Sequence, residues 1–220
     1  MTTLPRYRSV CVVIAGLALS GLTAGAAAAG EFNLVLNYGD PAPVWKDLPG
    51  IDGKMHSLAD LKSKETVVVV FTCNSCDYAR EYEDRIMALD KKYGGPAGKT
   101  TVVAINVNKV PADSLENLKA RATERGFKFA YLYDETQEIA KKFGAIRTPE
   151  FFVLNKDRRI VYMGSLDDSP DAAKAKTNYV AAAIDAALAG RKPSVIETVA
   201  IGCTIRFERR RRNRKKPANP

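Results

Sequence analysis

The chain has 220 residues, 46% of them hydrophobic, which is enough for one well-buried domain with further segments at its ends. This composition excludes a disordered protein, and only four cysteines exclude a disulfide-dense scaffold. The formal net charge of +9 is confined to the ends: residues 206–220 hold eight Arg or Lys and one Glu, and Arg6 and Arg8 supply the other +2.

Residues 1–29 have the three parts of a secretory signal. Two arginines precede an apolar stretch at residues 10–22, and the small-residue run "AGAAAAG" offers several A-x-A cleavage points. An uncleaved anchor is the alternative, because the uncharged part approaches the ~20 residues that span a bilayer. In both cases the domain is expected to be exported to the periplasm or cell envelope. Cys11 lies in this segment and is expected to leave with it on cleavage.

Residues 30–190 are predicted to form one α/β domain, because strand and helix patterns alternate along them. The stretch "VWKDLPGIDGKMHSLADL" has the Gly, Pro and Asp-Gly punctuation of an N-terminal β extension. Continuous apolar or β-branched runs then predict buried strands. These runs cover residues 67–72, 100–107, 129–134, 150–155 and 159–164.

Four helices are predicted from apolar residues spaced three and four apart. Capping signatures start the second at Asp113 with Glu116 and the third at Asp134 with Gln137, and Gly144 ends the third. The inward faces carry Tyr78, Tyr82, Ile86, Leu89 and Tyr93 in the first helix, Leu115, Leu118 and Ala122 in the second, Ile139 in the third, and Val180, Ile184 and Leu188 in the fourth, at residues 178–189.

Two cysteines, Cys73 and Cys76, occupy the loop between the first buried strand and the first helix. Such sheets place their chemistry in loops at the carboxyl ends of strands. Unpaired amide groups at the helix start are expected to stabilise a Cys73 thiolate, and cysteines in such settings have pKa values of roughly 3.5 to 7.5, against about 8.5 when free. Cys73 is therefore the predicted nucleophile, and Cys76 is the predicted resolving thiol.

The same spacing also occurs in structural disulfides and in zinc sites. A purely structural disulfide would close a loop of only a few residues, which stabilises little. A zinc site could formally use Cys73, Cys76, Cys203 and His56, the only histidine, but no second pair stands at finger spacing. No metal and no cofactor are expected.

The residues resemble the thioredoxin-like superfamily in "VVVVFTCNSC" and, about seventy residues later, in "FGAIRTPEFFVLN". The lead-in "DGKMHSLADLKSKETVVVVF" is similar to the redoxin branch, which includes exported thiol-disulfide proteins and the alkyl hydroperoxide reductase/thiol-specific antioxidant group. The resemblance covers Pro43 to about Leu188. It implies a thioredoxin-like fold with a central mixed β-sheet flanked by helices. It also implies a cis bond at Thr148-Pro149, with Thr148 against the bound substrate backbone.

The chain departs from the family pattern in three places. Thr72 replaces the usual Trp, Val67 stands where thioredoxin has a buried acid, and Asn74-Ser75 replaces Gly-Pro. Peroxiredoxins have Thr at the position of Cys73 and align their peroxide-reactive cysteine with Cys76, so the presence of Cys73 favours disulfide exchange.

The sequence therefore predicts an exported thiol-disulfide oxidoreductase that exchanges protein disulfides or thiols and takes electrons from a membrane partner. A redoxin-type thiol peroxidase is the second hypothesis. A non-enzymatic binding module that uses its cysteines as a redox switch is the third.

The C-terminal segments hold a leftover cysteine and a basic run. Cys203 lies in an arm at residues 191–205, and three roles are open. It is buried with the alternating Val199, Ile201 and Ile205, or bonded to another molecule, or an auxiliary resolving thiol brought to the active site by the close approach that Gly202 permits. Residues 206–220 are predicted to be a solvated, disordered tail or a contact with anionic membrane, and export excludes nucleic acid.

Overall fold

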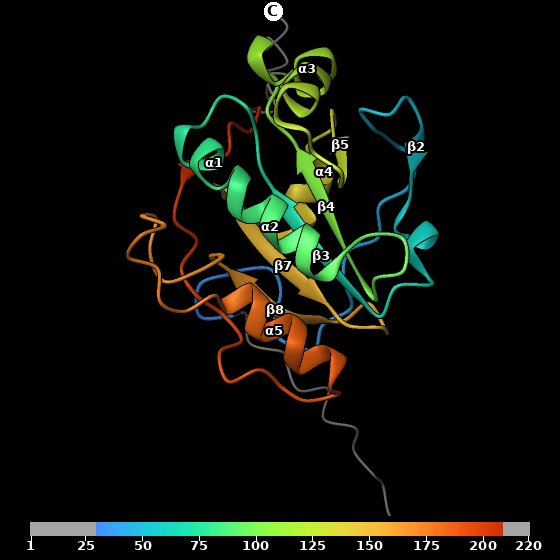
Figure 1. Ribbon diagram of the computed structural model, residues 1–220. Coiled ribbons are helices and arrows are strands. Elements are labelled where there is room, and N and C mark those ends of the chain that lie inside the picture. The colour runs from blue at the N-terminus through green and yellow to red at the C-terminus, as the bar shows by residue number, and fades with distance from the viewer. Residues whose placement is uncertain (1–29, 209–220) are drawn as a thin grey trace, which may run out of the picture.

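A five-stranded mixed sheet forms the centre of the computed structural model, which describes residues 30–208 (Figure 1). The predicted signal segment and most of the basic tail lie outside the described residues. The strand order is β5-β4-β3-β7-β8. The strands are β3 (Thr66–Phe71), β4 (Thr100–Asn106), β5 (Ala130–Tyr133), β7 (Glu150–Leu154) and β8 (Ile160–Gly164). The first three are parallel, and β7 and β8 run antiparallel beside β3.

The central strand β3 is buried on both faces, as its run of β-branched residues predicts. Because side chains alternate along a strand, Val67 and Val69 enter one hydrophobic core and Val68 and Val70 enter the other. The predicted α/β architecture is confirmed.

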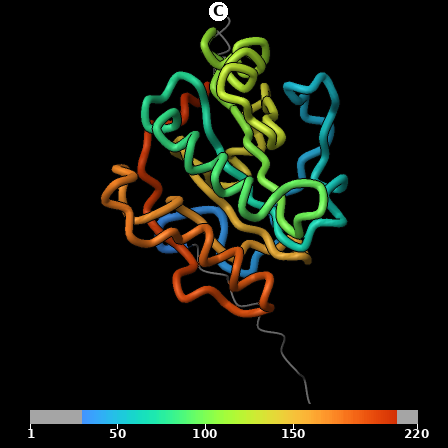
Figure 2. Tube along the Cα trace, viewed as in Figure 1, coloured from blue at the N-terminus to red at the C-terminus, as the bar shows by residue number. Residues whose placement is uncertain are grey.

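Five α-helices lie in residues 30–208 and flank this sheet (Figure 2). They are α1 (Asp77–Glu81), α2 (Glu83–Tyr93), α3 (Leu115–Arg125), α4 (Glu138–Phe143) and α5 (Tyr179–Leu188). Apolar residues of α2, α3 and α5 fill the core on one face of the sheet, and α4 and the N-terminal segment with Trp45 fill the core on the other. The predicted core residues Ile86, Leu89, Leu118 and Ile139 are all buried.

The single helix predicted after the cysteines is two helices. Tyr82 ends α1 and begins α2, with φ −88° and ψ −10°. Its ring is buried, and the Arg85 guanidinium lies 3.5 Å from the ring centroid. Because the chain turns there, Tyr78 does not share the buried face and is 42% exposed.

The two predicted helix starts are shifted. Ser114, not Asp113, caps α3 by accepting a hydrogen bond from the Asn117 amide, and Asp113 ends a short 3₁₀ helix, η2 (Pro111–Asp113). Asp134 accepts from the Ile139 amide rather than opening the helix itself. Gly144 ends α4 with φ 68°, as predicted.

Two small sheets flank the main one. The N-terminal extension contains the antiparallel pair β1 (Leu48–Pro49) and β2 (Met55–His56), followed by the 3₁₀ helix η1 (Leu58–Leu61). The C-terminal arm contributes β9 (Cys203–Thr204), which pairs antiparallel with β6 (Arg147–Thr148). Figure 1 shows the arm, in red, passing beside α1. Among residues 30–208, no helix has the length and apolar character needed to cross a membrane.

Replacing Phe152 with Ala is expected to lower the free energy of unfolding by about 3–5 kcal/mol. Phe152 is completely buried, with ring centroids 5.8 Å from Phe71 and 5.0 Å from Phe143. Urea unfolding followed by circular dichroism measures the change. Tyr78→Ala is the control, expected to stay within about 0.5 kcal/mol because this ring is half exposed. Equal effects of the two substitutions would contradict the core described here.

Candidate redox site

The two cysteines of the CxxC motif lie in the loop between β3 and α1, opposite Thr148 and Pro149. The Thr148–Pro149 bond is cis, as the resemblance implied. Thr148 is buried, with its Oγ1 atom 3.4 Å from the Cys73 sulfur and its carbonyl oxygen 3.2 Å from the Cys76 sulfur. Residues 75 positions apart along the chain thus meet around two sulfur atoms.

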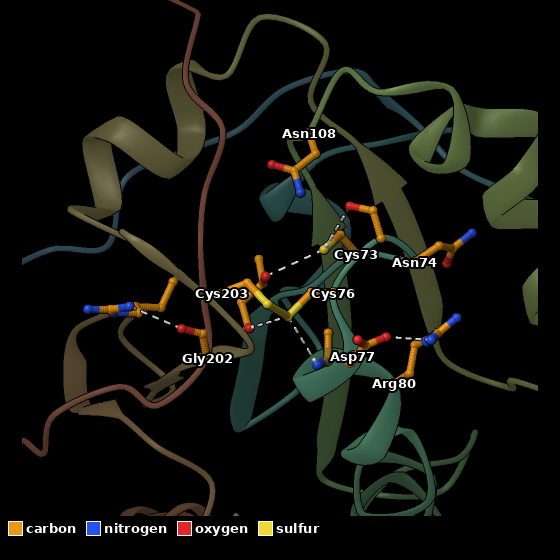
Figure 3. The surroundings of a disulfide bond; sticks show 12 residues. Cys73, Asn74, Cys76, Asp77, Arg80, Asn108, Gly202 and Cys203 are labelled. Atoms are coloured by element: carbon orange, nitrogen blue, oxygen red, sulfur yellow. Dashed lines mark hydrogen bonds and ion pairs between the residues drawn. A yellow bond between two sulfur atoms is a disulfide. The ribbon is translucent and has the colours of Figure 1, made fainter.

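A disulfide joins Cys76 to Cys203, which lie 127 positions apart in sequence and have their Cα atoms 6.0 Å apart (Figure 3). Cys73 is a free, buried thiol in contact with this bridge. The prediction that Val199 and Ile201 lie on a buried apolar face of the arm is wrong, because these side chains are 56% and 37% exposed. Of the three roles considered for Cys203, this geometry matches the arm that folds back to the active-site loop.

The arm reaches the cysteines because β9 pairs with β6. Thr148 is opposite Cys203, and Arg147 is opposite Thr204. Gly202 makes this approach possible, since a Cβ atom there would overlap the Thr148 carbonyl group. Arg147 Nη1 also donates to the Gly202 carbonyl oxygen at 3.1 Å. Sequence analysis missed this contact, because nothing local marks Arg147 as a partner of the arm.

Contacts on both sides of β9 hold the arm in place. Before it, the Thr198 hydroxyl is 2.6 Å from the Tyr162 hydroxyl. After it, Ile205 is 3% exposed and the Arg206 amide donates to Asn108 Oδ1 at 3.0 Å. The tail predicted to be solvated from residue 206 is therefore attached to the domain through residues 206–208.

The start of α1 faces Cys76, not Cys73. Cys76 is the N-cap residue, and its sulfur accepts the Ala79 amide at 3.4 Å. Burial raises the pKa of the Cys73 thiol; the Thr148 hydroxyl opposes this rise and the negative charge of Asp113 adds to it. The predicted stabilisation of a Cys73 thiolate by the helix start is therefore wrong.

The carboxylate of Asp113 holds the backbone of the CxxC loop in place. Its buried carboxylate accepts hydrogen bonds from the amides of Asn74, at 2.7 Å, and Ser75, at 2.9 Å, and from the Ser75 hydroxyl at 2.5 Å. The capping-box signature predicted that Asp113 bonds to the first turn of the helix that follows it. Its true partners are 38 and 39 residues away, which a local signature does not reveal.

The residues of the possible zinc site do not form a metal-binding group. His56 Nε2 lies 2.9 Å from Asp52 in the loop that joins β1 to β2. Within residues 30–208, no group of three or more His, Cys, Asp or Glu side chains is placed to hold a metal ion.

A mixed sheet with a CxxC loop facing a cis-proline defines a thioredoxin-like redox protein. A sequence profile of the redoxin family matches residues 37–181, and the chain belongs to this family.

Three solved structures are similar to this one. An uncharacterized conserved protein from Geobacillus kaustophilus is 38% identical with a TM-score of 0.72, covering 78% of this chain and 93% of that one. A hypothetical protein from Sinorhizobium meliloti is 33% identical with a TM-score of 0.72, covering 79% and 96%. A putative thioredoxin from Neisseria meningitidis, 24% identical with a TM-score of 0.54, covers 68% and 92% and shows the shared fold. A search of curated protein sequences found no significant match.

Asp113→Asn is expected to lower the pKa of the Cys73 thiol, because it removes a buried negative charge close to the sulfur. The rate at which iodoacetamide alkylates the Cys73-containing peptide, measured by mass spectrometry against pH, should therefore rise at lower pH than in the wild type. Glu116→Gln, an exposed substitution on α3, is the control. An unchanged or raised midpoint in Asp113→Asn would show that the charge of Asp113 does not act on Cys73.

Glu150, next to Pro149, makes stability depend on pH. Burial raises the pKa of Glu150 from 4.5 to about 7, against the hydrogen bonds that its carboxylate accepts from the Ile146 and Arg147 amides. Because the folded pKa lies above the unfolded one, this contribution is present at low pH and is lost as pH rises through about 7.

Between pH 4 and pH 8, the wild type should lose about 1–3 kcal/mol more unfolding free energy than Glu150→Gln, which cannot ionise. Urea unfolding at a series of pH values measures both proteins. Parallel pH profiles would show that folding does not raise the pKa of Glu150.

Proposed function

We propose that this redoxin-family protein is a thiol-disulfide oxidoreductase whose redox centre consists of Cys73, Cys76 and Cys203. The observation that carries the proposal is a free Cys73 thiol packed against a Cys76–Cys203 bridge, opposite Thr148 and Pro149. A free thiol beside a disulfide is the arrangement from which thiol-disulfide exchange proceeds.

The geometry favours Cys76 as the cysteine that bonds to substrate, which reverses the roles predicted from sequence. Cys76 is already bonded to Cys203, which pairs opposite Thr148. The Cys76 sulfur also accepts an amide hydrogen bond at the start of α1. Cys73 and Cys76 are equally buried, at 3% and 2% exposed, but burial raises the pKa of the Cys73 thiol, which suits a resolving thiol that reacts second.

The reaction with substrate is then two exchanges, preceded by reduction of the bridge. A dithiol of the membrane electron donor first reduces the Cys76–Cys203 bridge and is itself oxidised to a disulfide, which leaves Cys76 and Cys203 as thiols. The Cys76 thiolate then attacks a substrate disulfide, the Cys76–substrate bond forms, and the other substrate sulfur leaves as a thiolate. Cys73, after losing its proton, attacks the Cys76 sulfur, which forms a Cys73–Cys76 bridge and releases the second substrate thiolate. The substrate disulfide gains two electrons and two protons, and the protein dithiol loses them.

Hydroperoxide reduction is the second candidate, and the helix N-cap position of Cys76 favours it. The Cys76 thiolate would attack one peroxide oxygen, the O–O bond would break, and the other oxygen would leave as an alcohol, or as water from hydrogen peroxide, after taking up a proton. The resulting sulfenic acid would condense with Cys203 or Cys73 to a disulfide and release water. The third candidate remains a binding module that uses the cysteines only as a redox switch.

The proposal includes the compartment and partners expected from sequence. The signal-like residues 1–29 support export to the periplasm or cell envelope, where a membrane protein would supply electrons and protein disulfides would be substrates. The basic residues 209–220 would contact anionic lipid. Retention of the full chain in the cytoplasm during cell fractionation would contradict this part.

Insulin reduction by dithiothreitol and consumption of hydrogen peroxide separate the candidates. Cys76→Ser should lose insulin reduction by on the order of a hundredfold or more, because the exchanging sulfur is gone. Cys73→Ser combined with Cys203→Ser should form a mixed disulfide at Cys76 without turning over, because neither resolving thiol is then present. Cys11→Ser, a cysteine outside the domain, is the matched control.

Full insulin reduction by Cys76→Ser would refute the proposal. Peroxide consumption that depends on Cys76, without insulin reduction, would establish the peroxidase instead. A folded wild type that is inactive in both assays would leave the binding module.

A further inference from the structure

The C-terminal arm occupies the edge of β6 where a substrate backbone would lie. Cys203 is opposite Thr148 and bonded to Cys76, so the arm presents its cysteine to the site as a substrate would. We infer that residues 201–204 are a tethered mimic of the substrate, and that the site selects extended polypeptide disulfides in which glycine directly precedes the cysteine. This inference rests on the proposed exchange at Cys76.

Selection for glycine follows from the distance between the two backbones. A Cβ atom at residue 202 would overlap the Thr148 carbonyl group and lie 3.1 Å from the Pro149 nitrogen. Backbone atoms on both sides of the contact leave no flexible side chain that could move away. Thr148 is 1% exposed and is fixed by the structure around it, so any larger residue in that position must move the incoming chain.

Arg147 adds recognition of the same residue. Its Nη1 atom donates to the Gly202 carbonyl oxygen, and this contact uses only backbone atoms of the arm. The neighbours of this position carry less information, because Ile201 is 37% exposed and Thr204 is also exposed. Selectivity is therefore concentrated on the residue before the cysteine.

The arm is also a competitor for incoming chains. Thr198 is held by Tyr162 before the site, and Ile205 and Arg206 are held after it. Residues 199–204 therefore stay near β6 when the bridge opens, and their effective concentration at the site is high. A substrate must displace this short span, and weakening its pairing should admit substrate faster.

The test uses the full chain with Cys11→Ser, Cys73→Ser and Cys203→Ser, which leaves Cys76 as the single thiol and prevents resolution. The probes are pentapeptides, Ile-Gly-Cys-Thr-Ile and Ile-Ala-Cys-Thr-Ile, whose cysteine is a mixed disulfide with thionitrobenzoate. Attack by the Cys76 thiolate forms the Cys76–peptide bond and breaks the bond to thionitrobenzoate, which leaves with the electron pair. Its absorbance gives the rate, and mass spectrometry locates the peptide on Cys76.

The glycine peptide should react about tenfold faster than the alanine peptide, or more, because the alanine Cβ atom would overlap the Thr148 carbonyl group. Adding Gly202→Ala to the protein should speed the glycine peptide, since the arm then loses its own pairing. In the protein that already carries Gly202→Ala, whose arm has lost its pairing, adding Arg147→Met should slow the glycine peptide several-fold, because the peptide loses the hydrogen bond to its glycine carbonyl. The reaction with dithiobis-nitrobenzoate, which has no peptide backbone, should stay unchanged. Circular dichroism confirms that each variant is folded.

Equal rates with the two peptides, while dithiobis-nitrobenzoate still reacts at Cys76, would overturn the inference and leave the proposed function standing. No acceleration by Gly202→Ala would overturn the role of the arm as competitor. A folded protein in which Cys76 reacts with none of the three reagents would refute the proposed function and the inference with it.

Discussion

The close approach of the Gly202 backbone to the Thr148 carbonyl is the contact on which the site depends. It lets a strand of only two residues pair with β6, and this pairing brings Cys203 to Cys76. Without it, the CxxC loop would have two sulfur atoms instead of three, and the edge of β6 would be open. One residue without a side chain thus decides which chemistry the loop can carry.

The two CxxC sulfurs have different surroundings, which suit them to different steps of the exchange. Cys76 receives an amide hydrogen bond at the start of α1, whereas Cys73 lies in a buried place near the carboxylate of Asp113. Asp113 also accepts hydrogen bonds from the amides of Asn74 and Ser75. The loop is thereby held rigid, and the thiol form of Cys73 is favoured.

The strands and the place of the cysteines were predictable from sequence, and the pairing of the cysteines was not. Continuous β-branched runs such as Val67 to Val70 identify a strand buried on both faces, and the residues that follow it must emerge at the sheet edge. The cis bond before Pro149 came only from resemblance. The alternation of apolar residues along the arm led to a wrong prediction of burial, because β9 pairs at an edge where its neighbours Val199 and Ile201 face outward. Asp113 was misjudged because its decisive contacts are distant in sequence, and Tyr78 was misjudged because the predicted helix divides at Tyr82.

The Cys76–Cys203 bridge joins residues 127 positions apart, so the oxidation state of the site and the stability of the whole fold are thermodynamically linked. Closing a loop of that length removes conformational freedom from the unfolded chain, which is worth roughly 5 kcal/mol on the chain-entropy model. The protein therefore becomes less stable when this bridge is reduced. Anything that tightens the native fold around the arm must, by the same linkage, make the bridge harder to reduce.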